Sequence, residues 1–191
     1  ILTMEIKHSS KLLDYADSIC HSDNYLESGT CYGQSICRAI DAGFKRIKSV
    51  ELDAGFYEHC LTMFKDQPNV VLYHGHSTDK WPEMLKDVVK SVIFLDAHPA
   101  GPGTAGHNEF EEGDGRYGQD AIITRELEII LGHRNDHLIV IDDQNGENTD
   151  NAKYMDMCLA VNPNYTFEFW DENLSNDPEY YYKDKILVCL P

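Results

Sequence analysis

The feature that most constrains this sequence is a regular alternation of short apolar runs with longer amphipathic segments. Strand character is found at 24–30, 46–53, 69–75, 91–98, 137–143, 165–172 and 185–191. Helical periodicity is found at 10–20, 33–44, 55–66, 80–89, 120–133 and 151–161. Strands that alternate with helices in this way predict an α/β fold in which a mostly parallel sheet is wound on both faces.

The length and composition fit one domain of this kind. The chain has 191 residues, of which 42% are hydrophobic and 26% are charged, so it can bury a core and is not disordered. No internal repeat or interdomain linker is visible. We therefore expect residues 1–191 to form a single domain. Because the chain opens on Ile1, we also expect that domain to be trimmed or excised from a longer protein.

The charge and the cysteine content argue against several classes of protein. A net charge of −17 disfavours a nucleic-acid partner, whose phosphates require a basic surface. No window approaches the roughly 20 apolar residues of a membrane span, and no signal peptide is visible at the start. The six cysteines show no CxxC pair, which indicates free thiols and a reducing, cytoplasmic location rather than zinc ligands or disulfides.

Acidic residues end two of the apolar runs. Asp96 follows "SVIFL", and Asp142 and Asp143 follow "HLIVI". We expect these acids to be neighbours, because the carboxyl ends of parallel strands lie at one edge of a sheet. Three carboxylates would suit Mg²⁺ or Mn²⁺, and His98 could act as a general base near neutral pH. Helix capping for the acid pair, a loop hydrogen bond for Asp96 and a buried structural role for His98 are the alternatives.

A glycine-rich turn follows the first predicted strand. Residues 27–35 read "ESGTCYGQS", and a ligand could approach the backbone N–H groups at the start of the next helix. Glu51 ends the second strand, where doubly wound nucleotide-binding sheets keep an acid for the ribose hydroxyls. His76 and Ser77 follow the third strand at the same edge. The alternatives are a plain turn, a Glu51 that caps the next helix and a surface histidine.

In this order, the segments "YLESGTCYGQS", "VELD", "HGHS", "FLDAH" and "IDDQ" resemble the class I S-adenosylmethionine-dependent methyltransferases over nearly the whole chain. The sequence is most similar to the cation-dependent O-methyltransferases of the macrocin (sugar) type and, more distantly, of the catechol type. This resemblance implies a three-layer, doubly wound Rossmann-like fold with seven strands, of which the last is antiparallel. It implies a cofactor site formed by Glu27, Gly29, Thr30, Gly33, Ser35, Glu51, Leu52, His76, Ser77 and Asp96, and a metal site formed by Asp96, Asp142 and Asp143.

Departures from the family pattern bear on the reaction. In the sugar branch the metal acid begins an Asp-x-Asp pair whose second acid is the proposed base, and His98 stands at that position here. The catechol branch has a lysine three residues after the metal acid, where this sequence has Pro99. His76 replaces the cofactor-side acid after the third strand. We expect an O-methyltransferase that depends on Mg²⁺ or Mn²⁺, uses His98 and Asp96 as catalytic residues, and acts on a sugar or glycan hydroxyl.

Two further segments and three other functions stay open. The glycine-rich loop 99–118 is either a lid over the acceptor or an insertion without a role. Its candidate contacts are His107, Asn108, Arg116 and Tyr117. The tyrosines of 177–184 could stack on the acceptor, mediate homo-oligomer assembly or pack a hairpin. The other functions are methylation of a small phenol, metal-dependent hydrolysis by the same acids, and ligand binding by a non-catalytic module of the same fold.

Overall fold

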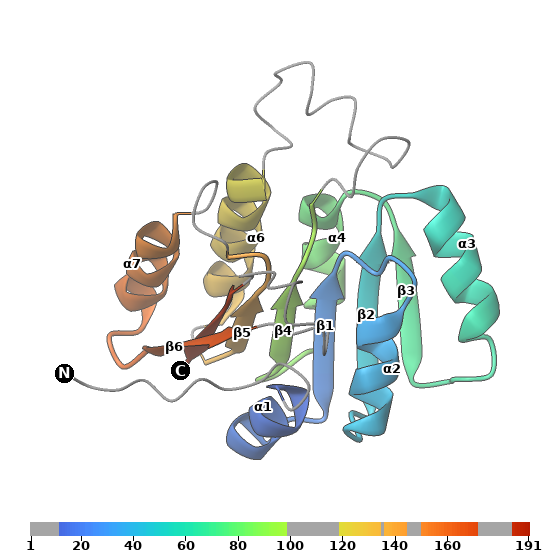
Figure 1. Cartoon of the computed structure of the whole chain (residues 1–191), viewed down its shortest axis with the longest axis horizontal. Coiled ribbons are helices and arrows are strands. Elements are labelled where there is room, and N and C mark those ends of the chain that lie inside the picture. Colours follow the sequence, from blue (N-terminus) through green and yellow to red (C-terminus); the bar gives the residue numbers. More distant parts are fainter. Residues whose placement is uncertain (1–11, 99–118, 135, 145–149, 172–184) are drawn as a thin grey trace, which may run out of the picture.

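A seven-stranded sheet forms the centre of the molecule (Figure 1). The computed structural model describes residues 12–98, 119–134, 136–144, 150–171 and 185–191. The strands are β1 (Asn24–Ser28), β2 (Arg46–Glu51), β3 (Val70–His74), β4 (Val92–Leu95), β5 (Leu138–Ile141), β6 (Thr166–Asp171) and β7 (Lys185–Leu190). The helices are α1 (Leu12–Cys20), α2 (Gln34–Asp41), α3 (Ala54–Met63), α4 (Ser77–Met84), α6 (Gln119–His133) and α7 (Asn151–Val161).

The strand order is β3-β2-β1-β4-β5-β7-β6. Strands β1 to β5 are parallel, and β7 pairs antiparallel with both β5 and β6. The chain order reverses between β1 and β4, which lie side by side in the centre of the sheet. The prediction of a Rossmann-like methyltransferase fold with an antiparallel last strand is confirmed. Ligands of such sheets bind outside the carboxyl ends of the strands at this point of reversal.

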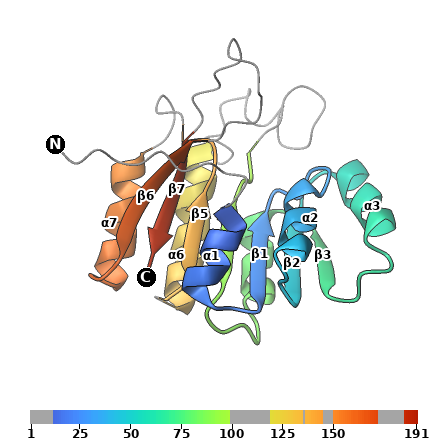
Figure 2. The same cartoon turned by 60° about the horizontal axis from the view of Figure 1, so that its bottom comes forward.

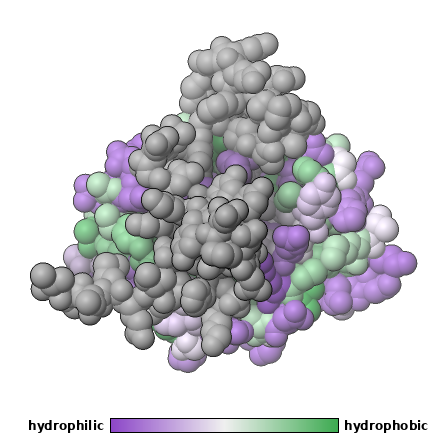
Figure 3. Space-filling model, viewed as in Figure 1, coloured by the Kyte–Doolittle hydropathy of each residue, from purple (hydrophilic) through white to green (hydrophobic). Residues whose placement is uncertain are grey.

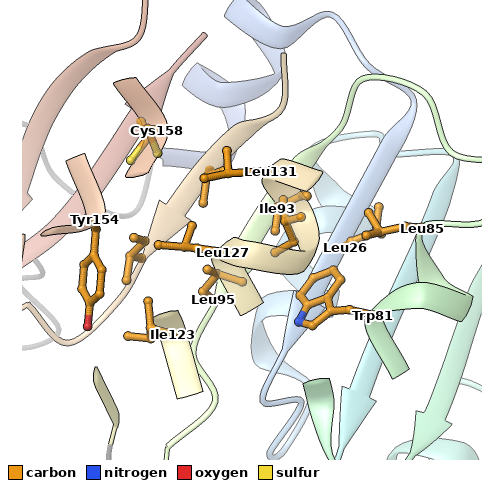
Figure 4. Close-up of a cluster of buried hydrophobic side chains, with 14 of the residues drawn as sticks. Leu26, Trp81, Leu85, Ile93, Leu95, Ile123, Leu127, Leu131, Tyr154 and Cys158 are labelled. Atoms are coloured by element: carbon orange, nitrogen blue, oxygen red, sulfur yellow. The ribbon is translucent and has the colours of Figure 1, made fainter. Parts of the chain in front are cut away.

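Helices cover both faces of the sheet (Figure 2). Side chains of α4, α6 and α7 pack on one face, in the cluster shown in Figure 4, and those of α1, α2 and α3 pack on the other. Neighbouring strand residues alternate between the faces, so Leu26 contributes to the first cluster and Tyr25 to the second. The central strands are buried on both faces, which explains why β4 and β5 read as continuous apolar runs.

The outer surface of α3 carries both polar and apolar residues. Figure 3 shows hydrophilic residues on the flank that carries this helix. Cys60 is the one fully covered side chain of α3, whereas Leu61 and Met63 are exposed among the polar residues. None of the helices in the described part of the chain is long and apolar enough to cross a membrane.

Helix α4 differs from its predicted bounds. It runs from Ser77 to Met84, whereas the sequence pattern predicts a helix over 80–89. It begins earlier because His76 is its N-cap and accepts a hydrogen bond from the Thr78 N–H. Pro82 consequently lies inside the helix instead of in its first turn.

Candidate active site

The carboxyl ends of the parallel strands form one continuous edge. The residues that follow β1, β3, β4 and β5 each donate a backbone N–H to the neighbouring strand, so these strand ends stay in register. These bonds run from Gly75 to Glu51, from Gly29 to Val50, from Asp96 to Ser28 and from Asp142 to Leu95, at 2.9–3.1 Å. The predicted glycine turn, the acid of β2 and the acids after β4 and β5 therefore share this edge.

The two glycines of the turn are required by packing within the protein. Gly29 has a φ of 85°, and a Cβ atom at this position would overlap the Asp96 carbonyl oxygen. Gly33 has a φ of 76°, and its Cβ atom would lie 2.6 Å from the Phe64 ring. The positive φ angles and these close approaches explain glycine at both positions. They also bring the turn against the backbone of Asp96.

Glu51 connects the turn to the end of β2. Its Oε2 accepts a hydrogen bond from the Cys31 N–H and its Oε1 accepts one from the Asp53 N–H, each 2.8 Å long. The alternative that Glu51 caps α3 is wrong, because Asp53 is the N-cap and its side chain accepts bonds from the Gly55 and Phe56 N–H groups. The Glu51 carboxylate therefore lies at the edge beside the glycine turn, and the residue is only 8% exposed.

Two predicted cofactor residues have side chains that face the interior. Glu27 is fully buried and accepts hydrogen bonds from the Tyr25 hydroxyl and the Ser49 hydroxyl, each 2.7 Å long. Burial raises the pKa of Glu27 to about 7, although Ser35, Tyr25 and Ser49 favour its charged form. Thr30 is also buried, and its hydroxyl bonds to that of Ser49. These side chains support the turn from behind.

Ser35 of α2 bonds to the buried Glu27, whereas Leu52, His76 and Ser77 lie along the edge. Leu52 is 37% exposed and follows Glu51. His76 is half-buried, bonds to the Thr78 hydroxyl at 2.8 Å, and has a lowered pKa because burial disfavours its charged form. Ser77 is buried at the first residue of α4. Their contact with a cofactor stays a prediction.

Three side chains converge after β4 and β5. Nδ1 of His98 lies 3.3 Å from Oδ1 of Asp96 and 3.1 Å from Oδ2 of Asp143. The side chains are 32%, 30% and 28% exposed, respectively, so the group is open to solvent on one side. One ligand atom from each residue lies within 4.8 Å of the others, and among the described residues this is the one group of His, Cys, Asp and Glu that could hold a metal ion.

Asp142, the third predicted metal ligand, lies outside this group. Its side chain is mostly buried, and its Oδ1 accepts a 2.8 Å hydrogen bond from the Asp143 N–H. Its carbonyl oxygen accepts a bond from the buried Gln144 amide. The acid pair therefore divides its roles: Asp142 supports the loop, and Asp143, with a φ of 54°, points its carboxylate toward His98.

The pKa of His98 differs from that of an unperturbed histidine. The hydrogen bond with Asp96 and the negative charges of Asp96 and Asp143 together raise the pKa of His98 to about 9, although burial opposes this shift. Burial in turn raises the pKa of Asp96. A histidine that keeps its proton near neutral pH is a counter-ion to the two acids in this arrangement, whereas the predicted base role assumes a pKa of about 6.5.

Glu126 of α6 is a buried acid that the sequence analysis did not identify. It is fully buried, and its Oε2 accepts a 3.2 Å hydrogen bond from the Ser28 hydroxyl at the end of β1. Burial raises its pKa to about 7, although Ser77 and Trp81 favour its charged form. Neither Glu126 Oε1 nor Trp81 Nε1 has a hydrogen bond of good geometry within the described part of the chain.

The sequence holds a signal for this residue. Glu126 lies four residues from both Ile122 and Ile130, on the apolar stripe of its helix. An acid on such a stripe must be buried, so the helical period could have identified it.

The predicted lid contacts His107, Asn108, Arg116 and Tyr117 lie outside the described residues, as do the tyrosines of 177–184. Their roles stay predictions.

Comparison with known proteins identifies similar folds. No protein-family model matches the sequence, and no curated protein is detectably similar to it. An O-methyltransferase from Bacillus cereus in complex with SAH is 16% identical with a TM-score of 0.59, over 95% of this chain and 80% of that one. TomG, an O-methyltransferase of Streptomyces achromogenes involved in tomaymycin synthesis, was solved with SAM and is 17% identical with a TM-score of 0.60, over 95% and 78%. A spermidine synthase is 11% identical with a TM-score of 0.58, over 95% and 59%. At these identities the likeness shows the fold.

Proposed function

We propose that the chain is an S-adenosylmethionine-dependent O-methyltransferase that uses a divalent cation and methylates a hydroxyl of a sugar or glycan. One observation carries the proposal: the Glu51 carboxylate beside the glycine turn and the Asp96–His98–Asp143 group lie on the same sheet edge, on either side of the reversal of strand order. A cofactor held at the first feature would present its reacting end to an acceptor held at the second. Similar folds that bind SAM and SAH support this choice of cofactor.

On the cofactor side, the proposal relies on the turn and on the ends of β2 and β3. Glu51 would bind the ribose hydroxyls, at the cost of exchanging its present bonds to the Cys31 and Asp53 N–H groups. His76 and Ser77 follow the neighbouring strand β3, where the adenine base of the cofactor would lie. Glu27 and Thr30 would act by supporting the turn, because their side chains are buried.

On the acceptor side, Asp96 and Asp143 would hold the cation. Bound S-adenosylmethionine would supply an electrophilic methyl group, and the cation would lower the pKa of the acceptor hydroxyl. The acceptor oxygen would attack that methyl carbon while the carbon–sulfur bond breaks with its electron pair staying on sulfur, so the donor would leave as S-adenosylhomocysteine. The hydroxyl proton would pass to solvent, because His98 with its raised pKa already holds a proton near neutral pH. The open side of the acid group leaves room for the acceptor.

A sugar acceptor is preferred to a phenol. The Asp96-x-His98 spacing resembles the sugar branch, and the lysine of the catechol branch is missing. The net charge of −17 is consistent with a small-molecule or glycan acceptor and disfavours nucleic acid.

The proposal is tested by following transfer of a labelled methyl group from S-adenosylmethionine to a panel of sugars, sugar nucleotides and catechols, with and without a chelator. We expect a methylated sugar, no product with the chelator, and recovery when a divalent cation is added back. Asp143→Asn should lose turnover but keep S-adenosylhomocysteine affinity, and the exposed control Asp66→Asn should lose neither. Methyl transfer that is insensitive to the chelator would contradict a role for the cation. Transfer to catechols alone would contradict a sugar acceptor.

A further inference from the structure

We infer that His98 is a ligand of the proposed cation, and that the site therefore selects Mn²⁺ or a similar transition-metal ion over Mg²⁺. The inference deepens the proposed function and rests on it for the role of the metal in the reaction. It is carried by the identity of the three converging side chains, which offer two carboxylate oxygens and one imidazole nitrogen.

The first step of the argument is the position of the nitrogen. His98 Nδ1 lies between the two carboxylates, 3.3 Å from one and 3.1 Å from the other. Ligand atoms of one metal ion are typically separated by about this distance, because each lies about 2.0–2.2 Å from the ion. An ion that displaces the His98 proton could therefore contact Nδ1 and the two carboxylates that face it after small shifts of the side chains.

The second step is the missing oxygen. A site of three aspartates would use Asp142, but its Oδ1 is bonded to the Asp143 N–H and the residue is only 7% exposed. Asp142 thus fixes the loop that carries Asp143, and the third place near the ion is taken by His98. The backbone of Asp96 is also anchored, because its N–H bonds to the Ser28 carbonyl next to the tightly packed Gly29.

The third step is the preference of metal ions for their ligands. Mg²⁺ takes oxygen ligands almost exclusively and gives up water reluctantly. Imidazole nitrogen suits first-row transition-metal ions better than it suits Mg²⁺, and Mn²⁺ is the member of that series best suited to carboxylate and water ligands. The protein supplies two oxygens and one nitrogen, and the three side chains are each about one-third exposed. The ion would therefore keep further coordination positions for water or for an acceptor oxygen. Replacing an oxygen ligand by nitrogen in this way weakens the binding of Mg²⁺ more than the binding of Mn²⁺.

The experiment measures metal binding alone, with the full chain and without cofactor or acceptor. Electron paramagnetic resonance of Mn²⁺ and calorimetry with Mn²⁺ and Mg²⁺ give the two affinities. We expect Mn²⁺ to bind at least about tenfold more tightly than Mg²⁺. Hyperfine coupling to nitrogen in the Mn²⁺ spectrum should identify a histidine ligand.

His98→Ala should weaken Mn²⁺ binding by about 10- to 100-fold and remove both the nitrogen coupling and the preference for Mn²⁺. The matched control is His59→Ala, which removes an exposed histidine of α3 and should change none of these values. Asp143→Asn keeps the shape of the side chain but removes its charge, so it should also weaken the binding of Mn²⁺. Circular dichroism checks that each variant is folded.

Three results would overturn the inference. Equal affinity for the two ions without nitrogen coupling would assign the site to oxygen ligands alone. Unchanged Mn²⁺ binding in His98→Ala, with turnover lost, would make His98 the base. No binding of either ion would make His98 the permanent counter-ion of the acids. A parallel titration with S-adenosylhomocysteine keeps these results distinct from failure of the proposed function, which would show as absent cofactor binding whatever the metal does.

Discussion

Glu126 shows how much one buried side chain can contribute to the pH dependence of this protein. It is fully buried between the end of β1 and α4, and its pKa is raised to about 7 because burial penalises its charge. The unfolded chain would ionise near pH 4.5 instead. Between these two values the folded state holds the extra proton, so the contribution of Glu126 to stability is present below about pH 4.5 and is lost as the pH rises to about 7.

Glu126→Gln removes this titration while keeping the shape of the side chain. We expect the variant to gain stability relative to the wild type as the pH rises, on the order of 2–3 kcal/mol between pH 4.5 and 7 and constant above that. Urea unfolding at pH 5 and pH 8 measures the difference. Glu128→Gln on the exposed side of the same helix is the control and should show no such trend. A difference between wild type and Glu126→Gln that does not change with pH would contradict a protonated Glu126.

Glu51 tests the cofactor side of the site at the same scale. Glu51→Ala leaves the Cys31 and Asp53 N–H groups without an acceptor, which should lower the free energy of unfolding by about 1–3 kcal/mol. If Glu51 also binds the ribose hydroxyls, the affinity for S-adenosylhomocysteine should fall by about tenfold or more. Calorimetry measures the affinity, and the exposed Glu58→Ala is the control. Lower stability with unchanged affinity would make Glu51 a purely structural residue.

At the scale of elements, the glycine turn is held against the strand that carries Asp96. Gly29→Ala would put a side chain on a residue with positive φ, and its Cβ atom would overlap the Asp96 carbonyl. Gly43 has a similar φ, but the space around it is open. We expect Gly43→Ala to cost about 1 kcal/mol for the backbone conformation alone. Gly29→Ala should cost several times more, because β1 and β4 must separate. Thermal unfolding of both variants measures the costs, and similar values would contradict the close packing of the turn against Asp96.

The elements themselves were largely predictable from the sequence. All seven strands lie within the predicted strand segments, because short apolar runs bounded by turn residues are typical of strands. The start of α4 was not predictable from periodicity, because it depends on the side chain of His76 acting as a cap. The placement of Asp96 and Asp143 at one edge follows from the topology, but the orientation of Asp142 depends on a local hydrogen bond that no sequence pattern encodes.

Burial accounts for the other residues that the sequence could not assign. Glu27 and Thr30 belong to the motif that resembles a cofactor site, but their side chains face the interior and bond to Ser49. A motif fixes the path of the backbone more firmly than it fixes which side chains reach a ligand.

At the scale of the whole molecule, the fold and the edge agree on one location for function. The reversal of strand order lies between β1 and β4, with the acid of β2 on one side and the Asp96–His98–Asp143 group on the other. The proposed transfer reaction would place its cofactor on the first side and its acceptor on the second. The account therefore depends on whether the edge binds the cofactor at all.

The most direct test is calorimetric titration of the full chain with S-adenosylhomocysteine, with and without Mn²⁺. The account predicts binding of one molecule per chain in both conditions, with the affinity weakened in Glu51→Ala. A wild-type chain that is folded by circular dichroism but binds no S-adenosylhomocysteine in either condition would contradict it.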